Sequence, residues 1–244
     1  MRSRWSPPRP DVVLRLVVRT FSEVCLTAGT LIVLFTAYVL LWTGVKADRA
    51  ATAERERLHD RWAASAPTAA PAPPPGGSAA PGTAQAPARP DTAPYEPGRA
   101  FAELYVPRFG KDWSRPVLEG TDPEPLKKGL GHYTGSARPG GDGNFAVAGH
   151  RRTYGDPFKD IPELRPGDTV TVRDATGWYT YTVRAEPLRI LPTETGVVAP
   201  VPRRSPFATP GRYLTLTTCD PEWGHSHRLV VWAELTGTRP AGSG

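Results

Sequence analysis

An uncharged apolar run near the N-terminus, VCLTAGTLIVLFTAYVLLWTGV at residues 24–45, constrains the fold of this 244-residue chain more than any other feature. As a helix rising ~1.5 Å per residue, the run would extend about 33 Å, which matches the ~30 Å hydrocarbon core of a bilayer. A signal peptide has a shorter apolar region followed by a small-residue cleavage site, and this run shows neither. We therefore expect a retained transmembrane anchor rather than a cleaved signal or a buried core helix.

The residues before this run predict which side of the membrane each end occupies. Arginines are frequent in residues 1–23, where only Asp11 and Glu23 oppose them. Positively charged flanks are retained in the cytoplasm, so we expect residues 1–23 to form a cytoplasmic basic N-terminus and everything after Lys46 to lie outside. The formal charge of +6 then indicates a soluble surface with compositional bias. An outside domain without a patterned stripe of arginines also favours no nucleic-acid partner.

Composition divides the rest of the chain. Residues 46–62, KADRAATAERERLHDRW, are charged and rich in Ala, which predicts a juxtamembrane helix that continues the anchor as a solvated stalk. Residues 63–100 are dominated by Ala and Pro and lack the apolar side chains of a core, which predicts a disordered linker. Residues 101–237 then form a single globular domain, and residues 238–244 a flexible tail.

The globular part has a β pattern. Short runs in which apolar and polar residues alternate, or in which β-branched and aromatic residues gather, are separated by Gly and Pro turns, and this favours an all-β barrel or sandwich. The predicted strands are residues 101–107, 144–150, 167–174, 178–191, 212–219 and 228–235. Helical periodicity is weak, with one short helix expected within residues 123–133 and a turn or 3₁₀ piece within residues 156–164.

The chain has two cysteines, and they cannot pair with each other if the topology is right. Cys25 lies inside the expected anchor, whereas Cys219 lies at the end of the predicted strand TLTTC. The outside compartment permits disulfides, yet Cys219 has no partner in its own chain. Cys219 therefore forms an intermolecular crosslink, has no role, or carries a reactive thiol.

Three polar residues at predicted strand ends suggest which of these holds. If residues 212–219 and 228–235 pair as a hairpin, Cys219 and Arg228 face each other at its base, with Cβ atoms about 5 Å apart. His150 ends another predicted strand and could meet them at the same rim. An ionised thiol is a nucleophile, a histidine can move a proton, and an arginine can hold a developing oxyanion. From residue types alone, a structural role for all three stays open.

The exact local sequences carry a family resemblance. TLTTC followed by Arg228 resembles the T-L-x-T-C and Arg signature of sortases. NFAVAGHRRTYGDPFKDI at residues 144–161 resembles the strand with the family's catalytic histidine, and LYVPRFG at residues 104–110 resembles its first strand. The local sequences around His150 and Cys219 are most similar to those of class E sortases.

The resemblance implies a sortase-type closed eight-stranded β-barrel with short helices. Cys219 would cleave a C-terminal LAxTG or LPxTG-like sorting signal between Thr and Gly through a thioacyl-enzyme. An amine of lipid II or peptidoglycan would then resolve it, with no cofactor. His150 would act as acid and base, Arg228 would stabilise the oxyanion, and Thr218 would help to shape the substrate groove. Residues 191–211 fall where the family has a substrate loop. The implied partners are surface proteins that bear sorting signals, the acceptor amine and the membrane.

Several other strings receive plainer interpretations. His225 and His227 lie near Asp220, but no second paired motif accompanies them, so we predict no metal site. The carboxylate of Asp220 beside the thiol would disfavour thiol ionisation. LPTETG at residues 191–196 mimics a sorting signal but has no hydrophobic tail after it, and DPF at residues 156–158 follows the histidine and is not a lid motif. Two further histidines are expected at the surface, His59 and His132.

Two alternative functions stay open at this stage. A pilin-polymerising sortase would use the same chemistry, with a lysine of another protein as the acceptor. A non-catalytic extracellular wall-binding β-barrel would leave Cys219 inert and give His150 and Arg228 structural roles.

Overall fold

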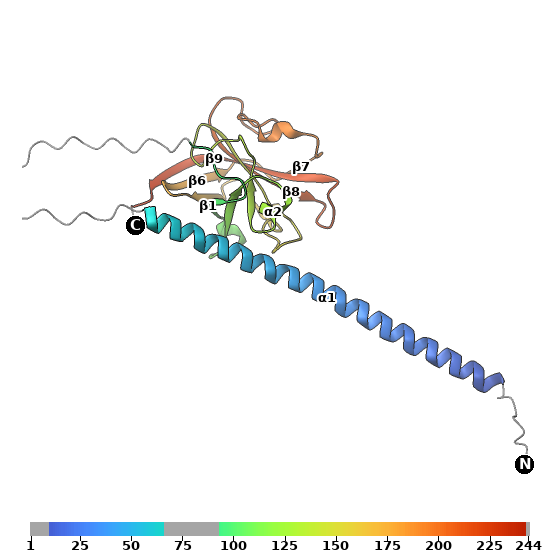
Figure 1. Ribbon diagram of the computed structural model, residues 1–244. Helices are drawn as coiled ribbons and strands as arrows, with labels where there is room; N and C mark the ends of the chain where they lie inside the picture. The colour runs from blue at the N-terminus through green and yellow to red at the C-terminus, as the bar shows by residue number, and fades with distance from the viewer. Residues whose placement is uncertain (1–9, 66–92, 243–244) are drawn as a thin grey trace, which may run out of the picture. The chain divides into compact units, whose positions relative to one another are not determined.

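The computed structural model describes residues 10–65 and 93–242, which form a long helix and a nine-stranded sheet (Figure 1). Most of the predicted linker, residues 66–92, lies outside the described residues, as do both chain ends. In chain order the elements are α1 (Pro10–Ser65), β1 (Ala100–Tyr105), η1 (Pro107–Phe109), β2 (Ser114–Glu119), α2 (Pro123–Leu126), β3 (Leu130–His132), β4 (Gly143–Ala148), η2 (Ile161–Glu163), β5 (Thr169–Arg173), β6 (Gly177–Val183), β7 (Leu188–Ile190), η3 (Thr195–Val198), β8 (Arg212–Asp220) and β9 (His227–Pro240).

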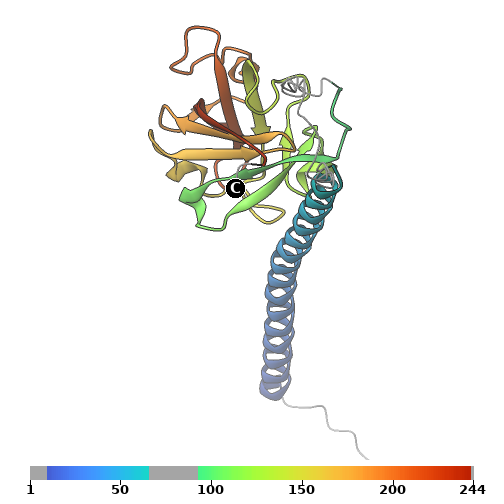
Figure 2. The same cartoon turned by 90° about the vertical axis from the view of Figure 1, so that its left-hand side faces the viewer.

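Eight of the nine strands close into a barrel, as predicted. The strand order is β6-β5-β1-β2-β3-β4-β8-β9-β7, and an additional pairing of β6 with β9 joins the two ends of the series. Strand β9 is long enough to have two partners on one edge: residues 233–240 pair with β6, and residues 228–230 pair with β7. The wrapping of the strands around a common interior is visible in Figures 1 and 2. Strand β7 is therefore an addition outside the closed ring.

The barrel interior is filled by the inward-facing side chains of strands in which inward and outward residues alternate. Val170 and Val172 of β5 are fully buried, whereas their neighbours in the strand are not. They join Leu214 and Leu216 of β8 and Phe145 of β4 in one apolar cluster. Because successive side chains of a strand point to opposite faces, this period of two is the signal that the sequence shows.

The outer face of β8 and β9 is also buried, because the segment around η3 covers it. Val197 packs there with Ile190, Val230 and Trp232 in a second apolar cluster. The Trp232 indole Nε1 donates a hydrogen bond to the Val197 carbonyl oxygen at 3.3 Å. The loop between β7 and β8 is thereby held against β9, the strand that carries Arg228.

Three element boundaries differ from the sequence-based expectation. The helix expected in residues 123–133 ends at Leu126, because residues 130–132 pair in parallel with β2 as β3. The strand expected at residues 178–191 divides into β6 and β7, with Pro187 between them. Strand β9 continues to Pro240, so the start of the expected flexible tail is paired with β6 through the Gly177–Pro240 register.

Residues 1–45 and residues 46–244 form two compact units. In the first unit the segment Leu14–Tyr38 of α1 is long and apolar enough to cross a membrane, with a mean hydropathy of 1.6. This window overlaps the predicted anchor at residues 24–45 and begins before it. A signal sequence near an N-terminus passes the same test, so the retained anchor stays a prediction.

In the second unit, the end of α1 packs on the barrel. The segment is helical, but one of its faces is not solvated as the charge pattern predicted. Leu58 is 1% exposed and packs with Ala100 of β1 and Leu118 of β2. Ala47 and Ala51 are buried as well. Alanines at this spacing leave room for close approach, so residues 46–65 belong to the folded domain.

A buried carboxylate on β1 explains the charges on this helix face. Glu103 is 1% exposed, and Arg55 lies 3.8 Å from its Oε1. His59 Nε2 is 2.8 Å from its Oε2, and the Tyr105 hydroxyl donates to the same oxygen at 2.6 Å. His59 is therefore part of a polar interface rather than a solvated surface residue. Burying a charge is costly unless it is paired and hydrogen-bonded, so the helix stabilises β1.

The prediction that His132 lies at the surface is wrong. It is 2% exposed on β3, and its Nδ1 is 2.6 Å from Oε2 of Glu119, itself 5% exposed. The Ser136 hydroxyl lies 2.8 Å from Nε2 of the same ring. The sequence around His132 gave no apolar alternation, because β3 is only three residues long and its pairing with β2 and β4 buries every residue.

Candidate active site

Parallel pairing of β4 with β8 brings the predicted histidine and cysteine to one rim of the barrel. The register runs from Gly143 opposite Arg212 to Ala148 opposite Thr217. Parallel strands end at the same edge of a sheet, so His150 and Cys219, each two residues further on, emerge side by side. The pairing continues past the strand, because the Gly149 amide donates to the Thr217 carbonyl at 3.1 Å.

The antiparallel hairpin of β8 and β9 adds the arginine. Cys219 is directly opposite Arg228 in the register, as the hairpin argument predicted. Directly opposed residues project their side chains to the same face of a sheet. The guanidinium Nη1 of Arg228 donates to the carbonyl oxygens of His225 at 3.1 Å and His227 at 3.0 Å. The loop between the strands therefore holds this side chain at the rim beside the cysteine.

A small pocket opens at this rim. It has a volume of about 220 Å³ and is lined by His150, Arg151, Arg152, Thr153, Cys219, Glu222, Trp223, Gly224 and His225. The histidine and the cysteine thus share one pocket, whereas Arg228 borders it without being part of its lining. Trp223 is 72% exposed, and the Arg152 guanidinium lies 4.8 Å from its ring centroid. The Trp223 ring therefore lies at the surface of this pocket and is not part of the core.

The environment of His150 sets its protonation. Its ring lies 5.0 Å from the ring of Tyr154, and its carbonyl oxygen accepts a hydrogen bond from the Phe158 amide at 2.9 Å. Desolvation by burial lowers the pKa of His150 below its usual value. The imidazole is therefore mainly neutral at neutral pH and is able to accept a proton.

Packing explains why the residue before the histidine is glycine. A Cβ atom at Gly149 would lie 2.5 Å from Cδ2 of Phe158 and 2.8 Å from Cδ2 of Leu130. Phe158 is fully buried in the core, so DPF at residues 156–158 is an internal packing element. The close approach of Phe158 to Gly149 fixes the backbone from which the histidine side chain projects.

Thr218, which the family resemblance assigns to the shaping of the substrate groove, lies at the junction of β4 and β8. It is 3% exposed, and its hydroxyl donates to the Gly149 carbonyl at 2.8 Å. The hydroxyl is therefore committed to the junction of β4 and β8. This hydrogen bond holds the backbone that precedes His150 against the backbone that precedes Cys219.

Sequence reasoning missed the two arginines that face Asp220, the residue after the candidate nucleophile. Asp220 forms ion pairs with Arg151 and with Nε of Arg189, the latter at 2.8 Å. The sequence predicted that the carboxylate would oppose thiol ionisation, but two guanidinium groups face it. Arg151 directly follows the histidine, which was the one available signal. Arg189 lies on β7, which the sequence did not separate from β6.

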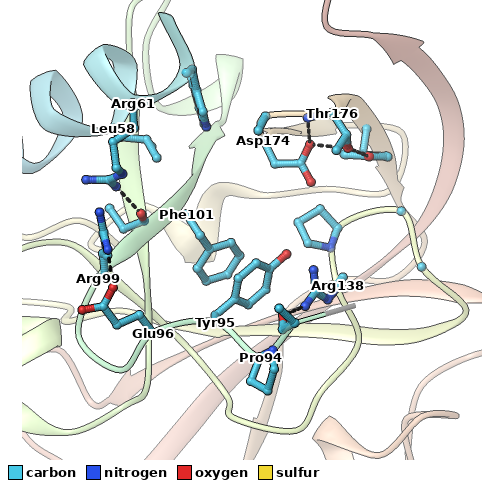
Figure 3. A pocket seen from close by; sticks show the side chains of 18 residues that line it. Leu58, Arg61, Pro94, Tyr95, Glu96, Arg99, Phe101, Arg138, Asp174 and Thr176 are labelled. Atoms are coloured by element: carbon cyan, nitrogen blue, oxygen red, sulfur yellow. Dashed lines mark hydrogen bonds and ion pairs between the residues drawn. The ribbon is translucent and has the colours of Figure 1, made fainter. Parts of the chain in front are cut away.

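A larger pocket, with a volume of about 630 Å³, lies beside the start of β4 rather than its end. Figure 3 shows the adjacent Tyr95 and Phe101 rings in it and Arg61 bonded to the carbonyl of Ala100, at 2.5 Å. Strand β4 has six residues, so about 20 Å separates its ends.

In the described parts of the chain, no three His, Cys, Asp or Glu side chains gather in a group that could hold a metal ion.

A thiol, an imidazole and a guanidinium at one rim can support acyl transfer through a covalent thioacyl intermediate. The comparisons with known proteins agree with this geometry. The Sortase domain model matches residues 104–236, and the chain belongs to the sortase family.

The most informative relatives place it within that family. Sortase SrtE1 of Streptomyces coelicolor is 35% identical over 233 residues, which are 93% of this chain, and the chain spans 59% of that relative's length. Sortase SrtE2 of the same organism is 33% identical over 94% of this chain and 86% of its own length. The predicted resemblance to class E sortases is thereby confirmed.

Solved structures give the same result for the barrel. Sortase E from Streptomyces avermitilis is 57% identical with a TM-score of 0.58, covering 62% of this chain and 96% of that chain. Sortase E1 from Streptomyces coelicolor, solved with a tripeptide in the active site, is 38% identical with a TM-score of 0.57 over the same shares.

Proposed function

We propose that this chain is a membrane-anchored cysteine transpeptidase. It cleaves an LAxTG or LPxTG-like sorting signal between Thr and Gly and transfers the new carboxyl end to an amine of lipid II or peptidoglycan. One observation carries the proposal: Cys219 and His150 line one pocket at the barrel rim, with Arg228 directly opposite Cys219 in the β8–β9 ladder. Kinship with class E sortases supports the choice of substrate class.

The first half-reaction forms the thioacyl-enzyme. His150 accepts the proton of the Cys219 thiol, and the sulfur attacks the threonine carbonyl carbon. The carbonyl oxygen becomes an oxyanion that Arg228 stabilises, because a guanidinium stays protonated at any physiological pH. Collapse breaks the C–N bond, and the protonated His150 gives its proton to the glycine nitrogen as it leaves. The threonine carbonyl is then a thioester on Cys219.

The second half-reaction reverses these roles. The acceptor amine attacks the thioester carbonyl and transfers a proton to His150. The sulfur leaves as a thiolate and recovers that proton, which restores the starting enzyme. Because burial lowers the pKa of His150, its neutral form is available as the base in this step. Water in place of the amine gives hydrolysis as the side reaction.

The hydrogen bonds of Arg228 leave guanidinium N–H donors available for the oxyanion. Within residues 10–65 and 93–242, its guanidinium makes hydrogen bonds through Nη1 alone, to the carbonyl oxygens of His225 and His227. A guanidinium has five donors, so those on Nε and Nη2 remain for a substrate carbonyl. Anchoring by Nη1 would fix the plane of the group and limit the entropy that is lost when substrate binds.

The membrane position of the enzyme belongs to the same proposal. The Leu14–Tyr38 segment supports an anchor, and the arginines before it support a cytoplasmic N-terminus. A membrane-impermeant maleimide added to intact cells should label Cys219 in a Cys25→Ser chain. Labelling that requires cell lysis would place the barrel on the cytoplasmic side and contradict this topology.

The test of the chemistry is a peptide assay with the full chain in detergent micelles. LAxTG and LPxTG peptides are incubated with an amine, and products and protein mass are followed together. We expect a thioacyl adduct on the wild type and on Cys25→Ala, and none on Cys219→Ala. Arg228→Lys should keep the adduct but form it more slowly. Peptide cleavage by Cys219→Ala at the wild-type rate would overturn the proposal.

A further inference from the structure

The residue after the candidate nucleophile carries a negative charge. Asp220 is the last residue of β8, and its side chain is 15% exposed. Asp220 directly follows Cys219, so its side chain points to the opposite face of the strand. A carboxylate on the neighbouring residue still disfavours thiolate formation, and partial burial strengthens the effect because water screens it less. Positive charges that pair with Asp220 would therefore offset this effect.

Arg151 supplies one counter charge and a backbone contact. Its side chain is 11% exposed and forms an ion pair with Oδ1 of Asp220. The same nitrogen, Nη1, donates to the Cys219 carbonyl oxygen at 3.4 Å. Arg151 follows His150 directly, so a single side chain links the backbone that carries the imidazole to the backbone that carries the sulfur. Burial restricts its rotamers, which makes this link rigid.

Arg189 supplies a second counter charge from another strand. Its Nε lies 2.8 Å from Oδ2 of Asp220, and its Nη2 lies 3.2 Å from Nδ1 of His227 on β9. Each carboxylate oxygen of Asp220 thus has its own arginine. Two guanidinium charges for one carboxylate give this three-residue group a net charge of +1.

We propose that Arg151 is a positioning residue that fixes the His150 backbone against Cys219 and, together with Arg189, offsets the charge of Asp220. This inference rests on the proposed transpeptidase function for its consequence in catalysis. Its electrostatic part does not, because it concerns the reactivity of the thiol alone. Arg151 is distinct from Arg228, which acts from the opposite strand and serves the substrate.

Other charged and titratable groups around the thiol set the background for a test. They are His150 and Arg151 after β4, Tyr154 against the His150 ring, Arg152 paired with Asp156 and Glu222, Arg189 on β7, Asp220 on β8, His225 in the loop before β9, and His227 and Arg228 at the start of β9. Arg151→Met removes one positive charge at similar side-chain length. Asp220→Asn removes the negative charge with little change of shape. The two variants therefore act in opposite directions.

The experiment measures alkylation of Cys219 by iodoacetamide as a function of pH. The full chain carries Cys25→Ser, so that Cys219 is the single thiol of a chain with two cysteines. We expect Arg151→Met to move the pH midpoint of alkylation up by about one unit. Asp220→Asn should move it down, and the double variant should return it toward the parent value. Arg212→Met, which breaks an exposed pair with Asp142, is the matched control and should leave it unchanged.

The positioning part has its own measurement. Arg151→Met should lower kcat for the peptide about tenfold with little change in KM, and the double variant should not recover this loss, because neutralising Asp220 does not restore the bond to the Cys219 carbonyl. Arg151→Lys, which keeps the charge, should recover the alkylation midpoint.

Two results would overturn the inference: alkylation midpoints of Arg151→Met and Asp220→Asn equal to the parent, or full kcat in Arg151→Met. If Arg151→Met does not fold, Asp220→Asn and Arg151→Lys still give the electrostatic answer. If the peptides are never cleaved by the wild type while the midpoints move as expected, the proposed function fails and the charge arrangement stands.

Discussion

Truncation of Leu58 tests whether the end of α1 belongs to the barrel. Its side chain is 1% exposed against Ala100 and Leu118, in a segment whose charge pattern predicts a solvated stalk. A stalk would tolerate Leu58→Ala, since substitutions at solvated positions usually change the free energy of unfolding by no more than about 0.5 kcal/mol. An integral helix would not.

The expected magnitude follows from the packing. Loss of three buried carbon groups at about 0.8 kcal/mol each amounts to about 2.4 kcal/mol, before any cost of the cavity. Leu→Ala changes in closed cores reach about 5 kcal/mol. Leu58 and Trp62 both line the pocket of about 630 Å³, so the surroundings can relax into the space that is left. We therefore expect a loss of about 3 kcal/mol, near the lower end of the measured range.

The assay is urea unfolding of residues 46–244, which form a compact unit, followed by tryptophan fluorescence. A loss of about 3 kcal/mol corresponds to a fall in Tm of about 6–12 °C for a domain of this size. Leu191→Ala is the matched control, because Leu191 is 52% exposed and its truncation should change little. Equal unfolding free energies for the two variants would refute the packing argument and return the segment to the role of a stalk.

Two further predictions concern the histidine. Gly149→Ala should lower kcat/KM at least tenfold and destabilise the domain by about 1–3 kcal/mol, because its Cβ would displace the ring of Phe158 and the backbone of His150; wild-type peptide cleavage by this variant would contradict it. Burial lowers the pKa of His150 in the folded state, so the unfolded chain binds a proton at this imidazole more readily than the folded chain does. The free energy of unfolding should therefore decline as the pH falls from about 6.5 toward the lower folded-state pKa. His150→Gln should remove that part of the decline in pH-dependent urea unfolding, and an unaltered pH profile would count against the burial effect.

Local pattern was enough to predict most of the strands. The alternation in residues 167–174 reflects the inward Val170 and Val172 of β5, and the runs on either side of Cys219 correspond to β8 and β9. These strands pack one face on the core, so their period of two appears directly in the sequence. Strand β2 was missed because Pro116 interrupts it, and β3 because three residues are too short to show a period.

The sequence by itself determined the all-β domain, the apolar segment near the N-terminus and the residue types of the site, since each depends on neighbours within a few positions of the chain. Only the tertiary structure decided which face of residues 46–65 is buried, that His132 lies inside, and that Arg151 meets Asp220, 69 residues away. Strand order and register set such meetings, and a shift of one residue would send every side chain of a strand to the other face. Contacts of this kind are properties of the closed barrel, and no local stretch of the chain encodes them.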